Sequence, residues 1–240
     1  MKIIFLGTSH GVPMPGRHYQ SIMLETDSAS YLFDVGAPVM DELITRNYDL
    51  ARIKSVFITH YHSDHVTGLI DMVGLAGWYF KKMEFSVYLP SEATKERFLD
   101  ARGGLYKREV VDRIKLNVIN EGLTYDDGNI KVTSFRTMHM ENAFGYLIEC
   151  EDKRIYITGD MHASLDDFID AKELGHVDSF ISECAHFPAL SLLEKLKTVD
   201  TDKIYVIHVF TVDKYYILRE HDNELEAELI FPNDGDEFLI

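Results

Sequence analysis

Thr59–His65, which reads Thr-His-Tyr-His-Ser-Asp-His, decides the fold, because it places three imidazoles and one carboxylate within six residues. The apolar run Ser55–Ile58 directly before it predicts a buried strand. Alternate residues of an extended chain point the same way, and a turn redirects the residues that follow. We therefore expect the first two histidines to bind one metal ion and the closing Asp-His pair to face a second. The predicted ligands of this stretch are His60, His62, Asp64 and His65.

The ligand types in this stretch limit which metal ions and which class of reaction are expected. Imidazole and carboxylate groups with no thiolate suit zinc, with manganese or iron as alternatives. Two divalent metal ions that share one water favour a hydrolase. Histidines that serve only as polar loop residues are the alternative, but four donors in a fixed order favour the metal site.

Three further positions can supply the ligands that a dinuclear centre still needs. His139 follows the alternating run Ile130–Arg136, and Asp160 and His208 each close an apolar run. Open α/β sheets commonly bind ligands at strand ends, so the repeated context supports a metal-binding role. A strand-edge or capping role is the alternative for each residue taken singly.

With these residues in this order, the chain resembles the metallo-β-lactamase superfamily. The resemblance implies an α/β fold, a four-layer αββα sandwich with a dinuclear site at one edge. It assigns His60, His62 and His139 to the first metal ion. It assigns Asp64, His65 and His208 to the second ion, with Asp160 bridging both. Asp64, besides binding metal, would orient the attacking water or accept its proton.

Two flanking segments are similar to the ribonuclease Z and small cyclic-nucleotide phosphodiesterase branch of that superfamily. One is the opening segment Met1–Pro13 with Gln20–Leu24 and Leu32–Gly36 after it, and the other is Ser182–Phe187. In the second segment the resemblance implies that His186 is a general acid for the leaving oxygen and that Glu183 is its partner. A helix-capping or surface histidine is the alternative.

Charge and spacing favour a small substrate. Only residues 140–159 separate His139 from Asp160, which leaves no room for the tRNA-gripping arm that ribonuclease Z carries there. The chain has 40 acidic and 24 basic residues, a formal net charge of −16, which repels a long polyanion. We therefore predict a phosphodiesterase that hydrolyses a small phosphodiester, a cyclic nucleotide above all, with cyclic phosphate or phosphonate esters of sugars as related candidates.

Other functions stay open at this stage. The same centre could hydrolyse carboxylic esters or lactones, or a short ribonuclease Z-like enzyme could cut RNA, although that needs a basic track. A redox member of the superfamily would normally carry a flavin domain as well. Arg17 and His18 are predicted to bind substrate at the rim of the site, where Arg17 would contact a phosphate. A solvated loop is the alternative for both.

Composition sets the outer limits. The chain has 240 residues and 46% hydrophobic content, which suits one hydrolase domain over residues 1–240. No signal peptide or membrane-length apolar run is present, so we expect a cytoplasmic protein that binds no membrane. The apolar stretch Val66–Phe80 predicts a homodimer interface, with ordinary burial as the alternative. Cys150 and Cys184 are expected to be buried free thiols.

Alternation, apolar runs and turn residues also predict the elements. Strands are expected at Lys2–Leu6, Ser21–Glu25, Tyr31–Asp34, Ser55–Ile58, Ser86–Leu89, Lys115–Ile119, Ile130–Arg136, Gly145–Cys150, Arg154–Thr158, Ser179–Ser182 and Lys203–Ile207. Helices are expected at Val66–Phe80, Ser91–Ala101, Leu165–Lys172 and Leu190–Lys197. Ser91 and Ser164 are the predicted N-caps.

Overall fold

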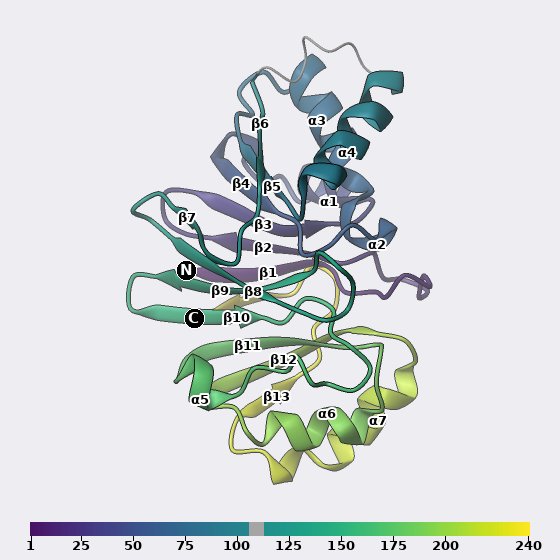
Figure 1. The fold of residues 1–240 in the computed structure, drawn as a ribbon, viewed down its shortest axis with the longest axis vertical. Helices are drawn as coiled ribbons and strands as arrows, with labels where there is room; N and C mark the ends of the chain where they lie inside the picture. The colour runs from purple at the N-terminus through teal and green to yellow at the C-terminus, as the bar shows by residue number, and fades with distance from the viewer. Residues whose placement is uncertain (106–112) are drawn as a thin grey trace. The chain divides into compact units, whose positions relative to one another are not determined.

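The computed structural model describes residues 1–105 and 113–240, and the chain divides into two compact units. Unit 1 comprises residues 1–119 and 233–239, and unit 2 comprises residues 120–232 and Ile240. Each unit contains a seven-stranded sheet (Figure 1). The prediction of one hydrolase domain over residues 1–240 stays a prediction.

The sheet of unit 1 changes from antiparallel to parallel at β3. Its strands are β1 (Lys2–Gly7), β2 (Ser21–Glu25), β3 (Ser30–Val35), β4 (Ile53–Phe57), β5 (Ser86–Leu89), β6 (Lys115–Val118) and β14 (Glu237–Leu239). They run in the order β14-β1-β2-β3-β4-β5-β6, and β3 to β6 pair in parallel. The register pairs Phe33 with Phe57, so the next residues of β3 and of the β4 loop lie side by side at one sheet edge.

Four α-helices accompany this sheet in the described part of unit 1. They are α1 (Val39–Thr45), α2 (Ser63–Val66), α3 (Gly68–Trp78) and α4 (Glu92–Leu105), and a 3-10 turn η1 covers Leu50–Arg52. Leu69, Met72 and Val73 of α3 are fully buried in one hydrophobic core with Leu32 and Val56 of the sheet. The predicted N-cap is confirmed at the start of α4, because Ser91 Oγ accepts the Thr94 backbone N–H at 3.2 Å.

Unit 2 has the reverse strand order in its sheet. Its strands are β7 (Gly122–Asp126), β8 (Lys131–Arg136), β9 (Phe144–Cys150), β10 (Lys153–Ile157), β11 (Val177–Cys184), β12 (Thr201–Val209) and β13 (Glu228–Ile230). The order is β13-β12-β11-β10-β9-β8-β7, antiparallel from β7 to β10 and parallel from β10 to β13. The adjacent strands β10, β11 and β12 therefore bring their carboxyl ends to one edge.

The helices of unit 2 are short. They are α5 (Ala171–Leu174), α6 (Ala189–Leu196) and α7 (Val212–Glu220), with a 3-10 turn η3 at Asp222–Glu224. Figure 1 shows α6 and α7 beside strands β11 to β13 of this unit. Leu192 and Leu193 of α6 and Leu218 of α7 are buried in one core with Phe180 and Val206. This packing fixes the segments that join the parallel strands to the helices.

The predicted helix Leu165–Lys172 is wrong. Leu165 has φ 57°, a left-handed conformation that an α-helix cannot contain, and helix α5 begins only at Ala171. Ser164 is therefore not a helix cap, and Asp170 caps α5 by accepting the Lys172 backbone N–H at 2.8 Å. The other predicted helices and all predicted strands match elements of the structure with ends shifted by a few residues.

Two smaller expectations can also be compared with the structure. Cys150 and Cys184 are confirmed as buried free thiols, and burial raises the pKa of the Cys184 thiol to about 12. Among the described residues, no helix is long and apolar enough to cross a bilayer. The cytoplasmic location stays a prediction.

Candidate metal centre

The four predicted donors of unit 1 lie together on the loop that follows β4. His60 Nε2 is 3.0 Å from His62 Nδ1, and His65 Nε2 is 3.5 Å from Asp64 Oδ2. The rings of His60 and His65 have centroids 4.1 Å apart. The chain turns into α2 directly after His62, so the last two donors project from the first helical turn. The structure therefore brings these four side chains together, and their role as metal ligands stays a prediction.

Asp34, which the sequence analysis did not single out, orients two of these imidazoles. Its carboxylate accepts the Thr59 backbone N–H at 2.8 Å, the Thr59 hydroxyl at 2.8 Å and His65 Nδ1–H at 2.7 Å. Thr59 Oγ1 is then left to accept from His60 Nδ1, 3.0 Å away. Both imidazoles thus carry their proton on Nδ1 and offer the Nε2 lone pair to a metal ion.

Two glycines of unit 1 make room for the donor loop. A Cβ atom at Gly11 would lie 3.1 Å from Asp64 Oδ2. A Cβ atom at Gly36 would overlap the backbone carbonyl of Asp64 and the side chain of Tyr19. The opening segment and the end of β3 therefore pack closely on Asp64, which leaves its carboxylate little freedom to move.

Unit 2 gathers three imidazoles around one buried carboxylate. Asp160 is only 3% exposed. Its Oδ2 is 3.7 Å from His139 Nε2 and 3.8 Å from His186 Nε2, and its Oδ1 is 3.5 Å from His208 Nδ1. These side chains follow or end different strands, as predicted. Gly159, with φ 60°, supplies the left-handed turn that places Asp160 after β10.

Glu183 and His186 form a hydrogen-bonded pair next to Asp160. Both carboxylate oxygens of Glu183 lie within 2.9 Å of His186 Nδ1, and since a carboxylate only accepts, Nδ1 carries the proton. Burial lowers the pKa of His186, but the hydrogen bond and the negative charges of Glu183 and Asp160 outweigh it, so the pKa lies above its usual value. The pair therefore has the geometry that an acid and its orienting partner need.

The chemistry of the unit 2 donors fits a divalent cation. Asp160, Glu183, His186 and His208 each offer a ligand atom within 4.8 Å of the others. Two carboxylates so close in a buried place repel each other, and a cation between imidazole and carboxylate donors removes that cost. The donor set contains nitrogen and oxygen only, which is compatible with zinc, manganese or iron.

The predicted substrate contacts Arg17 and His18 make other contacts within unit 1. The Arg17 guanidinium donates to the Thr8 hydroxyl and, at 3.0 Å, to Asn233 Oδ1. The His18 backbone N–H donates to Asp234, and its ring lies 3.3 Å from Glu42. These contacts tie the Gly11–Tyr19 loop to the segment before β14. Their role in substrate binding stays a prediction.

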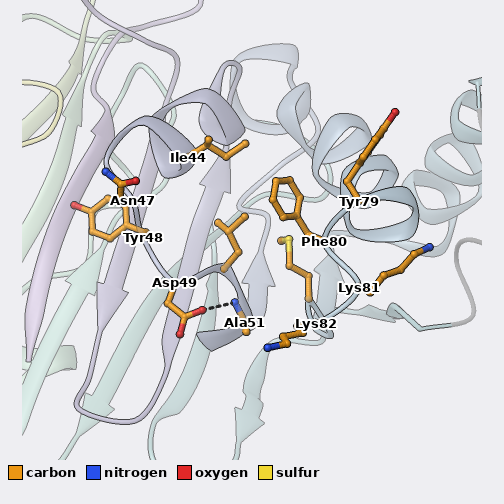
Figure 2. A pocket seen from close by; sticks show the side chains of 11 residues that line it. Ile44, Asn47, Tyr48, Asp49, Ala51, Tyr79, Phe80, Lys81 and Lys82 are labelled. Carbon is orange, nitrogen blue, oxygen red and sulfur yellow. Dashed lines mark hydrogen bonds between the residues drawn. The ribbon is translucent and has the colours of Figure 1, made fainter.

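Unit 1 also has an open groove of about 590 Å³, away from the donor loop (Figure 2). Residues from the end of α1, from η1 and from the segment after α3 line it. Ile44 and Phe80 face this groove, whereas Tyr79 points away from it. Trp78 and Tyr79 are 51% and 77% exposed, while the rest of the predicted apolar interface is mostly buried against the unit 1 core.

Comparison with known proteins identifies fold and family. The chain is 29% identical over 155 residues to ribonuclease Z of Bacillus subtilis (strain 168), covering 63% of this chain and 50% of that protein. The chain thus spans about half the length of the curated relatives it matches.

Solved structures share the fold at low identity. The metallo-β-lactamase fold protein YhfI from Bacillus subtilis superposes with a TM-score of 0.82 at 20% identity, over 99% of this chain and 98% of that one. The short form of human tRNase Z gives 0.79 at 20% identity, over 100% and 99%. The predicted metallo-β-lactamase fold is confirmed. A model of the family described as Anti-Pycsar protein Apyc1 matches residues 1–221. The chain therefore belongs to the Anti-Pycsar protein Apyc1 family, within the ribonuclease Z-like metallo-β-lactamase superfamily.

Proposed function

We propose that this protein is a dinuclear metal-dependent phosphodiesterase that hydrolyses a small phosphodiester, most simply a cyclic nucleotide. The observation that carries the proposal is the Glu183–His186 pair beside Asp160. A metal site alone serves many hydrolases, whereas an oriented imidazolium 3.8 Å from a candidate ligand supplies the proton that a departing alkoxide needs.

The proposed metal ligands are the seven side chains that the sequence predicts. Support comes from the nitrogen and oxygen donors of each set and from the superfamily to which the chain belongs. The residues that would hold two divalent ions, with zinc favoured, are His60, His62, Asp64, His65, His139, Asp160 and His208. When bound, such ions neutralise phosphate charge and lower the pKa of a coordinated water.

Side chains of the protein would then accept the proton of the attacking water and donate a proton to the departing oxygen. Asp64 would orient the attacking water and accept its proton, and the close packing of Gly11 and Gly36 around Asp64 supports this role by limiting its movement. The water oxygen adds to phosphorus, the ester P–O bond breaks, and His186 gives its Nε2 proton to the departing oxygen. Glu183 keeps His186 protonated and correctly turned. The product is a phosphomonoester with a free hydroxyl.

A small substrate is favoured by the hairpin between two of the proposed ligands. Strands β9 and β10 fill most of residues 140–159 and pair antiparallel, with Lys153 opposite Cys150. The formal net charge of −16 also opposes a long polyanion. A cyclic mononucleotide carries one phosphate charge and places one ester oxygen as the leaving group.

Cleavage of RNA is the second candidate, because the curated relatives are ribonuclease Z proteins. It predicts activity on precursor tRNA that falls steeply with salt. Hydrolysis of a carboxylic ester or lactone is a third possibility, which needs no acid for an alkoxide leaving from phosphorus.

One panel of substrates separates these activities. Metal-loaded protein is incubated with cyclic mononucleotides, bis(p-nitrophenyl) phosphate, a lactone and a precursor tRNA, with Asp64→Ala in parallel. We expect turnover of the phosphodiesters by the wild type and none by the variant. Turnover confined to the lactone or to the tRNA would overturn the proposal.

We also propose that the protein is a homodimer that packs through the exposed end of α3. Support comes from the exposed aromatic residues Trp78 and Tyr79 beside the apolar groove. Light scattering of the wild type should give twice the chain mass, and Trp78→Ser combined with Tyr79→Ser should give the single-chain mass. An unchanged mass would contradict this interface.

A further inference from the structure

The loop that carries His186 is held on one side by a single lysine from α7. Lys214 Nζ donates to the backbone carbonyls of Cys184 at 2.8 Å, Ala185 at 2.8 Å and Phe187 at 2.7 Å. An ammonium group has three N–H donors, and three carbonyls accept them here. Three carbonyl groups of the segment from the end of β11 to the start of α6 thus point to the Lys214 ammonium.

Glu183 holds the backbone N–H groups of the same loop. Its carboxylate accepts the N–H of Ala185 at 2.8 Å and that of His186 at 3.3 Å. It also accepts the N–H of Met161, directly after Asp160, at 2.8 Å. Backbone N–H groups of the loop therefore donate to the Glu183 carboxylate, and backbone carbonyl groups of the loop accept from the Lys214 ammonium. His186 belongs to the segment that both groups hold.

We propose that Lys214 is a positioning residue that fixes His186 for proton transfer, an inference that rests on the proposed function. Without the ammonium, three carbonyl dipoles would converge with no donor, and a buried acceptor that loses its donor costs about 1–3 kcal/mol. The loop would relax by turning those carbonyls toward water. His186 lies between two of the three contacted residues, so its ring would leave Glu183 and Asp160.

The place of Lys214 in the chain links two proposed functional segments. Helix α7 begins at Val212, three residues after β12 ends at Val209, and β12 contains His208. The lysine projects back from α7 to the loop after β11. It thereby couples the position of His186 to the strand that carries His208.

The kinetic test uses leaving groups of different quality on Lys214→Met, which keeps the aliphatic stem and removes the charge. We expect kcat for a cyclic mononucleotide to fall about 10- to 100-fold with little change in KM, as when a residue that orients a catalytic group is lost. Turnover of bis(p-nitrophenyl) phosphate should fall less than about threefold, because p-nitrophenolate leaves without a proton. Lys214→Arg should recover part of the loss, since it keeps the charge.

The control is Lys172→Met, at an exposed position on α5, which should match the wild type on both substrates.

A spectroscopic readout does not depend on turnover. The hydrogen-bonded Nδ1 proton of His186, assigned by its loss in His186→Asn, should appear downfield in the NMR spectrum of the wild type and Lys172→Met and disappear in Lys214→Met. If Lys214→Met does not fold, the same kinetic and NMR measurements are made on Lys214→Arg, and their outcome decides whether Lys214 positions His186.

Equal losses on both substrates, or an unchanged Nδ1 resonance, would overturn the role of Lys214 while leaving the phosphodiesterase proposal intact. Failure of the wild type on both phosphodiesters would overturn the proposed function instead. In that case the Nδ1 resonance alone still tests whether Lys214 positions His186.

Discussion

The two units build their donor sets in opposite ways. Unit 1 supplies four donors from six consecutive residues, and the carboxylate that orients two of them comes from Asp34, 31 residues before His65. Unit 2 supplies donors from separate strand ends, and Glu183, which orients His186, is only three residues from it in the chain. In unit 1 the donors are close together in the sequence and their orienting residue, Asp34, is far away. In unit 2 the donors are far apart in the sequence and Glu183 is close to the His186 that it orients.

This contrast predicts how each donor set responds when one of its residues is substituted. Loss of the support in unit 1 disturbs several donors at once, because His60 and His65 share one hydrogen-bonded network through Thr59. Loss of one donor in unit 2 leaves the others in place, because each is anchored by its own strand.

The largest expected effect is that of Asp160→Ala. We expect complete loss of turnover and of bound metal, since the variant removes the carboxylate around which His139, His186 and His208 gather. Burial and the charge of Asp160 both oppose ionisation of Glu183, but the hydrogen bonds to His186 and His208 outweigh them, so its pKa lies below its usual value. The stability of metal-free protein should not fall, because the variant removes the repulsion between the two carboxylates. Metal content by mass spectrometry and thermal unfolding in chelator check both statements.

Asp152→Ala, in the exposed turn between β9 and β10, is the control and should behave as the wild type. If Asp160→Ala unfolds in chelator where the control does not, the donors of unit 2 are not independently anchored, and the comparison between the units fails.

The second effect, smaller and confined to unit 1, is that of Asp34→Asn. An amide cannot accept from both Thr59 and His65 as the carboxylate does, so two imidazoles lose their fixed tautomer. We expect metal affinity and turnover to fall about 10- to 100-fold, the range seen when an outer hydrogen-bond partner of a ligand is removed. Asn also tolerates the left-handed backbone at this position, φ 58°, so the strand should stay intact.

Metal titration followed by calorimetry measures the affinity, and Asp71→Asn, exposed on α3, is the matched control. An affinity equal to that of the control would mean that Asp34 supports the strand end and not the ligands.

The same contrast explains what the sequence could predict. Donors at the ends of long apolar strands are visible because the strand pattern and the donor are adjacent in the chain, as for His208 after its buried run. Asp34 was not visible as a support, because its contact with His65 depends on the parallel register of β3 and β4. Lys214 was not visible for a related reason, since its three acceptors lie on another segment.

Two of the strands that the sequence missed are explained by their length. Strands β13 and β14 have three residues each, too few for an alternating pattern to be detected. The predicted helix at Leu165 failed because Leu165, Phe168 and Ile169 have helical spacing but are core residues of a turn. Spacing reports which side chains are buried and does not report a left-handed φ.

The smallest expected effect is on stability and tests how tightly unit 1 packs around its donors. Gly36→Ala places a methyl group against the backbone carbonyl of Asp64 and the side chain of Tyr19, and backbone atoms cannot move aside as a flexible side chain can. We expect the free energy of unfolding to fall by about 1–3 kcal/mol, as for other overpacked sites. Gly103→Ala on α4 is the control, and we expect it to raise the free energy of unfolding. Apart from the backbone of its own helix, no atom of the described residues lies within 4 Å of the new methyl group, and Ala favours the helix by about 0.5–1 kcal/mol. Urea unfolding of both variants measures the two changes. If Gly36→Ala were as stable as the wild type, the loop after β4 would have room to shift, and the donors of unit 1 would owe their position to Asp34 alone.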